Sequence, residues 1–335
     1  MTKHPSVSVI IPAFNAEKYI RQAVTAACGQ SYPGIEVIVV DDGSTDSTVE
    51  ILKNMNGVII RQQNNSGPAA ARNLGAACAQ GEVLFFTDSD CLARRDWIAT
   101  AMKGFSSEEI AVVAGSYGIA NPQNLLARCV HAEILYRHER LMPDYPKSFG
   151  SYNFGIRKQV FEQIGGFDTG YRQASGEDND LSYKVLRSGL IIYFARDAKV
   201  DHFHPERLLP YLKSQFRHGF WRAKMYQDHP KMAGGDDYTF WKDMVEIPLA
   251  GLLVLLPILG FWFEGFLKFA GIILIFIWVI ELWFAAHMGK NFQEKCFLAF
   301  MMFLRSFARM AGFSAGILAF PLVKMANKCC KHKHL

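Results

Sequence analysis

The chain has 335 residues, half of them hydrophobic, and a formal net charge of +5. This length exceeds what one core usually holds, and charged sequence gives way to long apolar runs after about residue 243, so we expect a catalytic domain followed by an apolar part. The basic residues near the end follow apolar sequence, which argues against a nucleic-acid-binding protein. The seven cysteines are odd in number and lack CxxC spacing, which argues against a disulfide framework and a zinc site.

Short apolar runs alternate with helical periods in the first part of the chain. We expect strands at residues 7–11, 36–40, 58–61 and 83–86, with helices at 16–29, 44–54 and 67–79 between them. Alternation of this kind predicts an α/β fold with a mainly parallel sheet and helices on both faces. Ligands of such sheets bind at the carboxyl ends of the strands.

The elements become shorter and mixed further along. Strands near 153–157 and 191–194, a helix ending at 164 and a helix starting at 177 should complete the same domain. Residues 208–225 are predicted to be helical. We expect the stretch 116–152 to consist of loops.

Two nearly charge-free runs, at 245–263 and 269–286, are each about long enough to span a bilayer, and Glu281 lies inside the second. They predict a transmembrane helical hairpin within residues 240–290. Lys and Arg accumulate before residue 245 and after residue 286, which places both ends of the hairpin on the cytoplasmic side. The apolar run that starts at Val7 is too short for the core of a signal peptide. We therefore expect a multi-pass protein of the cell inner (cytoplasmic) membrane, with its catalytic domain facing the cytoplasm.

Residues 297–319 are apolar but carry Arg305 and Arg309, which lie four apart and so share one helical face. For the first half of this run the pattern favours a helix in the membrane interface, whereas the part at 312–323 is short of full spanning length. We expect interfacial or membrane-associated helices and a basic tail over 291–335, with membrane lipid as a partner.

Two acidic motifs fall at strand ends. Asp88 and Asp90 flank Ser89 directly after a buried strand, and residues i and i+2 of an extended chain project to the same side, so both carboxylates could converge on Mn²⁺ or Mg²⁺. Asp42 ends the second strand, where its carboxylate could accept a hydrogen bond from a nucleobase or a ribose hydroxyl. Both motifs also suit turns and helix caps.

A third acidic cluster opens a later helix. Glu177, Asp178 and Asp180 are more acids than the helix dipole requires, so one carboxylate could take the proton of an acceptor hydroxyl as general base. His202 and His204 follow another strand, and one of the two could supply a further metal ligand.

Two arginines lie on the helix expected at 208–225. Arg217 and Arg222 could face a diphosphate and offset the charge that develops on a leaving group. Their alternative place is the membrane surface.

The motifs together are more specific than any one of them. In order, the chain reads VSVIIPAFN at 7–15, VIVVDDGSTD at 37–46, RN at 72–73, TDSD at 87–90, GGFD at 165–168 and GEDNDL at 176–181. Over about residues 6–224 this series resembles the inverting family 2 glycosyltransferases with the GT-A fold, of the membrane-anchored bacterial type. The resemblance implies a Rossmann-like mixed sheet flanked by helices, followed by C-terminal membrane helices.

The resemblance also implies the division of the catalytic domain and the roles of its residues. The GT-A domain would cover 1–235, with a nucleotide-sugar-binding part at about 1–115 and an acceptor-binding part at about 116–235. The donor would be held by Pro12, Ala13, Asn15, Glu17, Asp42, Arg72, Asp88 and Ser89. The metal, Mn²⁺ or Mg²⁺, would be held by Asp90, Asp88 and His202. Asp178 would be the catalytic base, and Glu177, Arg217 and Arg222 would serve the acceptor side or the diphosphate.

Processive members of this family carry Gln-x-x-Arg-Trp after the base, whereas residues 215–219 read QFRHG and lack that tryptophan. We therefore expect one sugar to be added, from a UDP-linked donor, to a hydroxyl of a glycan, lipid-linked or surface-polysaccharide acceptor. The alternative is a catalytically inactive membrane scaffold or accessory subunit of a glycan-assembly complex. A homo-oligomer and glycan-assembly partners are both compatible with these expectations.

Two other enzyme classes are disfavoured. A dinucleotide-dependent oxidoreductase needs a glycine-rich turn after the first strand, and residues 12–15 contain no glycine. A nucleotidyltransferase needs a glycine- and lysine-rich phosphate loop, which is missing near the start.

Overall fold

The structure, a computed structural model, describes residues 5–173, 175–232, 234, 237, 239 and 241–331, with side chains as far as residue 320. It divides into two units. The first comprises Met1–Pro122 and Ile134–His204, and the second comprises Gln123–Glu133 and Pro205–Leu335. The helix after His204 belongs to the second unit, where it packs with the C-terminal helices.

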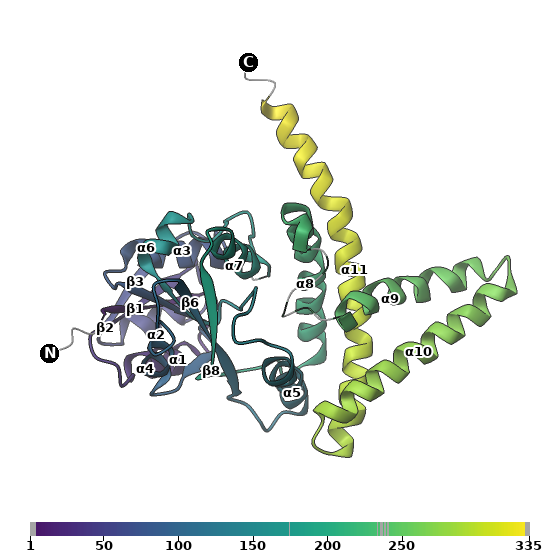
Figure 1. Ribbon diagram of the computed structural model, residues 1–335, viewed down its shortest axis with the longest axis horizontal. Coiled ribbons are helices and arrows are strands. Elements are labelled where there is room, and N and C mark those ends of the chain that lie inside the picture. The colour runs from purple at the N-terminus through teal and green to yellow at the C-terminus, as the bar shows by residue number, and fades with distance from the viewer. Residues whose placement is uncertain are drawn as a thin grey trace. The chain divides into compact units, whose positions relative to one another are not determined.

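An eight-stranded sheet forms the centre of the first unit (Figure 1). Its strands are β1 (Val7–Ala13), β2 (Ile35–Asp41), β3 (Val58–Gln62), β4 (Val83–Thr87), β5 (Cys91–Ala93), β6 (Ile110–Ile119), β7 (Asn153–Arg157) and β8 (Ile191–His202). Their order is β3-β2-β1-β4-β7-β6-β8-β5. The pairs among β1, β2, β3 and β4 are parallel, as the alternating pattern predicts, whereas β7 runs antiparallel to β4 and β6. The α/β expectation is confirmed, and the sheet is mixed.

The helices of the first unit are α1 (Ile20–Cys28), α2 (Thr48–Lys53), α3 (Pro68–Cys78), α4 (Trp97–Met102), α6 (Lys158–Gln163) and α7 (Glu177–Arg187). Helices α1, α2 and α3 each connect parallel strands, whereas α4, α6 and α7 lie in connections between antiparallel strands. Helix α5 (Leu125–Arg140) begins in the second unit and ends in the first. The expectation of loops over 116–152 is wrong, because β6 extends to Ile119 and α5 occupies the middle of this stretch.

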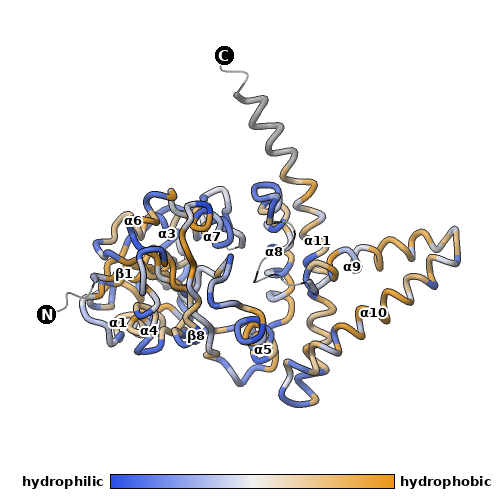
Figure 2. The backbone as a smooth tube through the Cα atoms, in the orientation of Figure 1, coloured by the Kyte–Doolittle hydropathy of each residue, from blue (hydrophilic) through white to orange (hydrophobic). Residues whose placement is uncertain are grey.

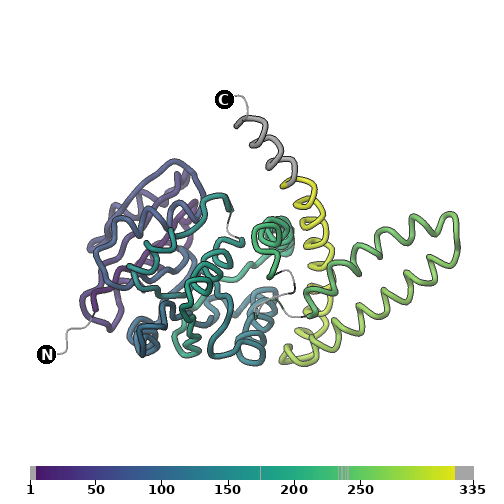
Figure 3. Tube along the Cα trace, turned by 45° about the horizontal axis from the view of Figure 1, so that its top comes forward, coloured from purple at the N-terminus to yellow at the C-terminus, as the bar shows by residue number. Residues whose placement is uncertain are grey.

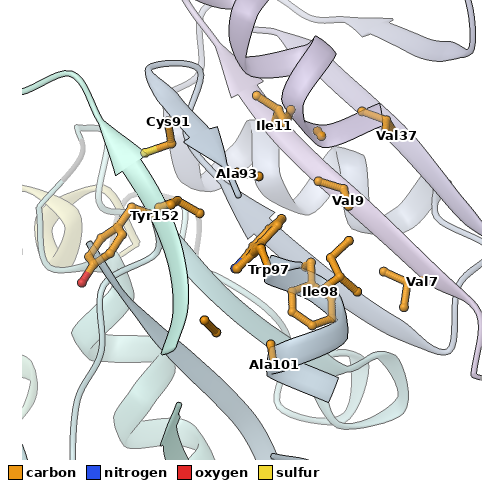
Figure 4. Packing of buried hydrophobic residues seen from close by; sticks show 14 of the residues in the cluster. Val7, Val9, Ile11, Val37, Cys91, Ala93, Trp97, Ile98, Ala101 and Tyr152 are labelled. Atoms are coloured by element: carbon orange, nitrogen blue, oxygen red, sulfur yellow. The ribbon is translucent and has the colours of Figure 1, made fainter. Parts of the chain in front are cut away.

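Trp97 lies in the core between the sheet and α4 (Figure 4). It is fully buried, meets the edge of Phe85 at a centroid distance of 5.3 Å, and donates from Nε1 to Asn153 Oδ1 at 2.6 Å. The amide of Asn153 in turn donates to the carbonyls of Ser116 and Ala198. These contacts tie α4, β6, β7 and β8 together beneath the strand ends that carry the site.

The second unit is helical. Its elements are α8 (Leu208–Asp228), a 3₁₀ turn (Pro230–Met232), α9 (Trp241–Leu259), α10 (Glu264–Met288) and α11 (Phe292–Lys331). Helices α9 and α10 form a hairpin in both orientations (Figures 1 and 3), and most of both helices is strongly hydrophobic (Figure 2).

Two described segments are long and apolar enough to cross a membrane, namely Glu264–Met288 and Phe292–Phe320. The first agrees with the predicted run at 269–286. The second covers residues 292–320, where interfacial or membrane-associated helices were expected. Helix α9 was expected to span, but it carries Lys242, Asp243 and Glu246 and is not one of these two segments.

Buried ion pairs explain the charges within these apolar helices. Lys242 pairs with Glu246 and with Glu281, the latter at 2.8 Å, and Arg305 pairs with Glu133 and Glu246. Arg305 is therefore buried and bonded within the unit, contrary to the interfacial face expected for it. Burying such charges is tolerable because each has an opposite partner.

Close contact between α8 and α11 depends on glycine. A Cβ at Gly219 would lie 2.1 Å from the carbonyl oxygen of Arg309. We expect Gly219→Ala to destabilise the protein by about 1–3 kcal/mol, because the two backbones must separate. Gly271, on α10, has no heavy atom within 4 Å of the same position, so Gly271→Ala gains the same helix propensity without the clash. Thermal unfolding of both detergent-purified variants checks this, and equal midpoints would contradict the packing argument.

Candidate functional site

Asp90 and His202 meet at one end of the sheet in the first unit. Asp90 follows β4, and the antiparallel pairing of β5 with β8 places Cys91 opposite His202. This register brings His202 Nε2 to 3.4 Å from Asp90 Oδ1, and the Phe203 amide donates to the Asp90 carbonyl at 3.0 Å. Both side chains remain accessible, with exposed fractions of 38% for Asp90 and 17% for His202.

Cys91 joins these two residues, and sequence reasoning missed it. Ligand atoms of Asp90, Cys91 and His202 all lie within 4.8 Å of one another, the only such cluster among the residues that the structure describes. Burial, followed by the charges of Asp90 and Asp88, raises the pKa of the Cys91 thiol well above its ordinary value. A thiol binds metal as the thiolate, so we assign Cys91 to packing rather than to coordination.

His202 and Asp90 shift each other's pKa values. Burial alone would lower the pKa of His202, but the carboxylates of Asp90 and Asp88 outweigh it and raise the pKa. Burial likewise opposes ionisation of Asp90, yet His202 and local hydrogen bonds hold the Asp90 pKa below its ordinary value. Each side chain therefore favours the charged form of the other, namely the Asp90 carboxylate and the protonated His202 ring.

Asp88 faces a different partner from Asp90. Its Oδ1 accepts a hydrogen bond from Arg72 Nη2 at 2.8 Å, and Arg72 Nη1 donates to Glu177 Oε1 at 3.0 Å. Arg72 and Glu177 are each 2% exposed. Sequence reasoning placed Arg72 and Asp88 at the donor, and the structure adds a buried bridge from the end of β4 to the start of α7.

Glu177 and Asp178 open α7. The chain turns into this helix through Gly176, whose φ of 95° suits glycine. Burial, and then the neighbouring Asp178 carboxylate, raise the pKa of Glu177 to about 7, although Arg72 acts in the opposite direction. Asp178 Oδ1 accepts from the Asn179 amide at 2.9 Å.

The raised pKa predicts a pH-dependent stability. The unfolded chain releases the Glu177 proton near pH 4.5 and the folded chain near 7, so the stability from this group is full below 4.5 and is lost as pH rises through about 7. We expect the thermal midpoint of Glu177→Gln to fall less than that of wild type between about pH 5 and about pH 8. Glu162→Gln, at a side chain 63% exposed, is the control. Identical pH profiles for wild type and Glu177→Gln would contradict the assignment.

Asp42 lies buried at the end of β2, where its oxygens hold a loop. Oδ1 accepts from Gln63 Nε2 at 2.6 Å and from the Ser66 amide at 2.8 Å, and Oδ2 accepts from the Gly67 amide at 2.8 Å. These contacts occupy three of about four acceptor positions of the carboxylate. Asp42 thus fixes the turn that leads into α3, the helix that carries Arg72.

The loop after β1 is bound to the turn after β2. The Asn15 amide donates to Ser44 Oγ at 2.9 Å, and Glu17 Oε2 accepts from the Ser47 amide at 3.0 Å. Asn15 and Glu17 are exposed, whereas Pro12 and Ala13 are the last residues of β1. The pairing of β1 with β4 ends before Pro12. The lack of an amide hydrogen on Pro12 therefore removes no hydrogen bond between β1 and β4.

The remaining predicted residues are split between the units. Ser89 is partly exposed between Asp88 and Asp90 in the first unit, whereas Arg217 and Arg222 lie on α8 in the second. Their assignment to the diphosphate stays a prediction.

Comparisons with known proteins agree with this fold and these motifs. The family model described as Glycosyl transferase family 2 matches residues 8–165. The probable glycosyltransferase YdaM of Bacillus subtilis is 28% identical over 325 residues, which cover 91% of this chain and 73% of that protein. Glycosyltransferase AglE of Haloferax volcanii is 30% identical over 225 residues, covering 64% of this chain and 72% of AglE.

Other relatives match more partially. The pre-mycofactocin glycosyltransferase of Mycobacterium tuberculosis is 30% identical over 68% of this chain, which spans 49% of that protein. Among solved structures, the mannosyltransferase PcManGT from Pyrobaculum calidifontis, in complex with GDP-Man and Mn²⁺, has a TM-score of 0.61 at 19% identity, covering 94% of this chain and 88% of PcManGT. This likeness confirms the expected GT-A fold.

Proposed function

Since the chain belongs to glycosyl transferase family 2 and is a glycosyltransferase that uses a nucleotide-sugar donor, we propose that it is inverting, non-processive and dependent on Mn²⁺ or Mg²⁺. The donor we propose is UDP-linked, and the acceptor is a hydroxyl of a glycan, lipid-linked or surface-polysaccharide molecule. The observation that best supports metal dependence is the short distance, 3.4 Å, between Asp90 Oδ1 and His202 Nε2.

The donor atoms fit such a cation. Neighbouring ligands at about 2.1 Å in an octahedron lie about 3 Å apart, close to the 3.4 Å between Asp90 Oδ1 and His202 Nε2. A carboxylate and an imidazole suit Mn²⁺, and a carboxylate suits Mg²⁺. PcManGT is a protein of the same fold that binds Mn²⁺ and GDP-Man, which supports the proposal. When bound, the cation would offset the charge of the diphosphate.

The chain's own residues supply the rest of the reaction. Asp178 accepts the acceptor's hydroxyl proton while the acceptor oxygen forms a bond to the anomeric carbon. The bond from that carbon to the diphosphate oxygen breaks, and its electron pair leaves with the nucleoside diphosphate. Arg72 holds Glu177 beside Asp178 and so fixes the start of the helix that carries the base. Asp42 shapes the loop that we propose for the nucleobase.

We also propose a multi-pass protein of the inner (cytoplasmic) membrane whose catalytic unit faces the cytoplasm. Support comes from the two apolar segments at 264–288 and 292–320 and from the exposed aromatic tip between α9 and α10. Phe261, Trp262 and Phe263 are 86%, 66% and 68% exposed, which suits the interface of a bilayer. Membrane lipid is thus a proposed partner.

The test is nucleoside diphosphate release by detergent-purified protein across UDP-, GDP- and dTDP-sugars, with Mn²⁺, Mg²⁺ or chelator. Asp90→Ala should lose metal-dependent release by at least about 100-fold, because the cation loses its carboxylate. Asp201→Asn is the control, since Asp201 lies one residue from His202 but pairs with Arg94. Chelator-resistant release would overturn metal dependence, and donor binding without release by wild type, even with acceptors supplied, would favour the inactive scaffold.

A further inference from the structure

His202 and His204 are hydrogen-bonded to each other. Their Nδ1 atoms lie 3.0 Å apart, and the rings meet edge to face with centroids 4.7 Å apart. His202 Nε2, on the far side of its ring, faces Asp90. The two histidines therefore take different places, since only His202 presents a nitrogen to the cluster of Asp90 and Cys91 in the described part of the chain.

This contact constrains the proton on His202. A hydrogen bond between two ring nitrogens needs one N–H donor and one lone-pair acceptor. A neutral imidazole carries one ring proton, so His202 can offer a lone pair at Nε2 only when its proton sits on Nδ1. That Nδ1–H then points at His204 Nδ1, which must be the acceptor.

The backbone of His204 is held in place for this role. Its amide donates to Asn121 Oδ1 at 3.0 Å, and its carbonyl accepts from Asn121 Nδ2 at 2.8 Å. His204 is 2% exposed, and the Tyr117 ring packs against both histidines, with centroids 5.1 Å from His202 and 5.7 Å from His204. An acceptor held this firmly sets both the tautomer and the ring orientation of His202.

We propose that His204 is a positioning residue that accepts the Nδ1 proton of His202 and thereby keeps the His202 Nε2 lone pair directed at the divalent cation. This inference rests on the metal dependence proposed above. It resolves the choice between the two histidines that the sequence left open, with His202 as the ligand and His204 behind it. Partners of this kind typically change metal affinity by about 10- to 100-fold.

The test is the dissociation constant of Mn²⁺ alone, measured by electron paramagnetic resonance on the full chain in detergent. His204→Leu removes the acceptor, whereas His204→Asn keeps an amide oxygen near the place of Nδ1 and should rescue binding. We expect His204→Leu to weaken Mn²⁺ binding by about 10- to 100-fold and His204→Asn to stay within about threefold of wild type. His202→Leu sets the value for a lost ligand, and metal-free thermal midpoints show whether each variant is folded.

The outcomes separate the two proposals. Weak binding by a folded His204→Leu, rescued in His204→Asn, supports the positioning role. Wild-type affinity in His204→Leu, or equal weakening in both His204 variants with unchanged midpoints, overturns it while leaving metal dependence intact. If wild-type protein does not bind Mn²⁺, the metal dependence itself fails, and the role of His204 falls with it.

Discussion

Asp178→Asn is expected to lower kcat by about 10²- to 10⁴-fold, because the amide cannot accept the acceptor's proton. Asparagine keeps the size of the side chain at the start of α7, and donor binding should change by less than about threefold. Steady-state transfer and a donor-binding titration on the same sample separate the two effects.

Asp180→Asn is the matched control for this variant. Asp180 lies in the same first turn of α7 but pairs with Lys184 at 2.8 Å along the helix. We expect its kcat to stay within about threefold of wild type, because an i,i+4 pair contributes only about 0.3–0.5 kcal/mol. If Asp180→Asn lost activity and Asp178→Asn retained it, the base would have to be reassigned.

Arg72→Met is expected to reduce the free energy of unfolding by about 3–5 kcal/mol, because it removes one partner of a buried ion pair. Arg72 and Glu177 are both 2% exposed, so the Glu177 carboxylate would be left buried beside Asp178 without its cation. The pKa of Arg72 is itself raised, since the charges of Asp88 and Glu177 outweigh the effect of burial. Chemical denaturation measures the loss.

Two further variants sharpen this expectation. Adding Glu177→Gln to Arg72→Met should restore part of the stability, because the uncompensated charge is removed. Arg94→Met breaks the pair with Asp201, where the arginine is 47% exposed, and should cost no more than about 1 kcal/mol. Similar losses for Arg72→Met and Arg94→Met would show that burial does not govern the strength of the first pair.

The sequence predicted the parallel part of the sheet because its strands are continuous apolar runs. Strands β1, β2 and β4 are almost wholly buried, and such runs are recognisable without knowledge of their partners. The antiparallel direction of β7 was not predictable in this way, because it depends on the path of the chain through α5. Helix α5 was missed since it carries seven Arg, His and Glu side chains and has only a weak apolar face.

In the candidate site too, local sequence predicted where residues lie but did not predict all of their partners. Motif spacing predicted that Asp88 and Asp90 would lie at a strand end, and the family resemblance implied that His202 would share a metal with them. Neither predicted that Arg72 would pair with Asp88. Those partners depend on the packing of α3 and on the register between β5 and β8, which are contacts between distant parts of the chain. The involvement of Cys91 follows from the same register, and no local signal indicated it.

Helix α5 has a consequence for how the enzyme can be divided. Residues 123–133 belong to the helical unit although they lie between two segments of the catalytic unit. In that unit Arg128 pairs with Glu294, and Glu133 pairs with Arg305. A chain shortened after His204 would retain these two side chains and lose both partners, leaving unmatched charge on an otherwise intact helix. The C-terminal helices are thus not a detachable tether, and fragments that lack them would be poor substitutes for the whole chain in enzymology or inhibitor screening.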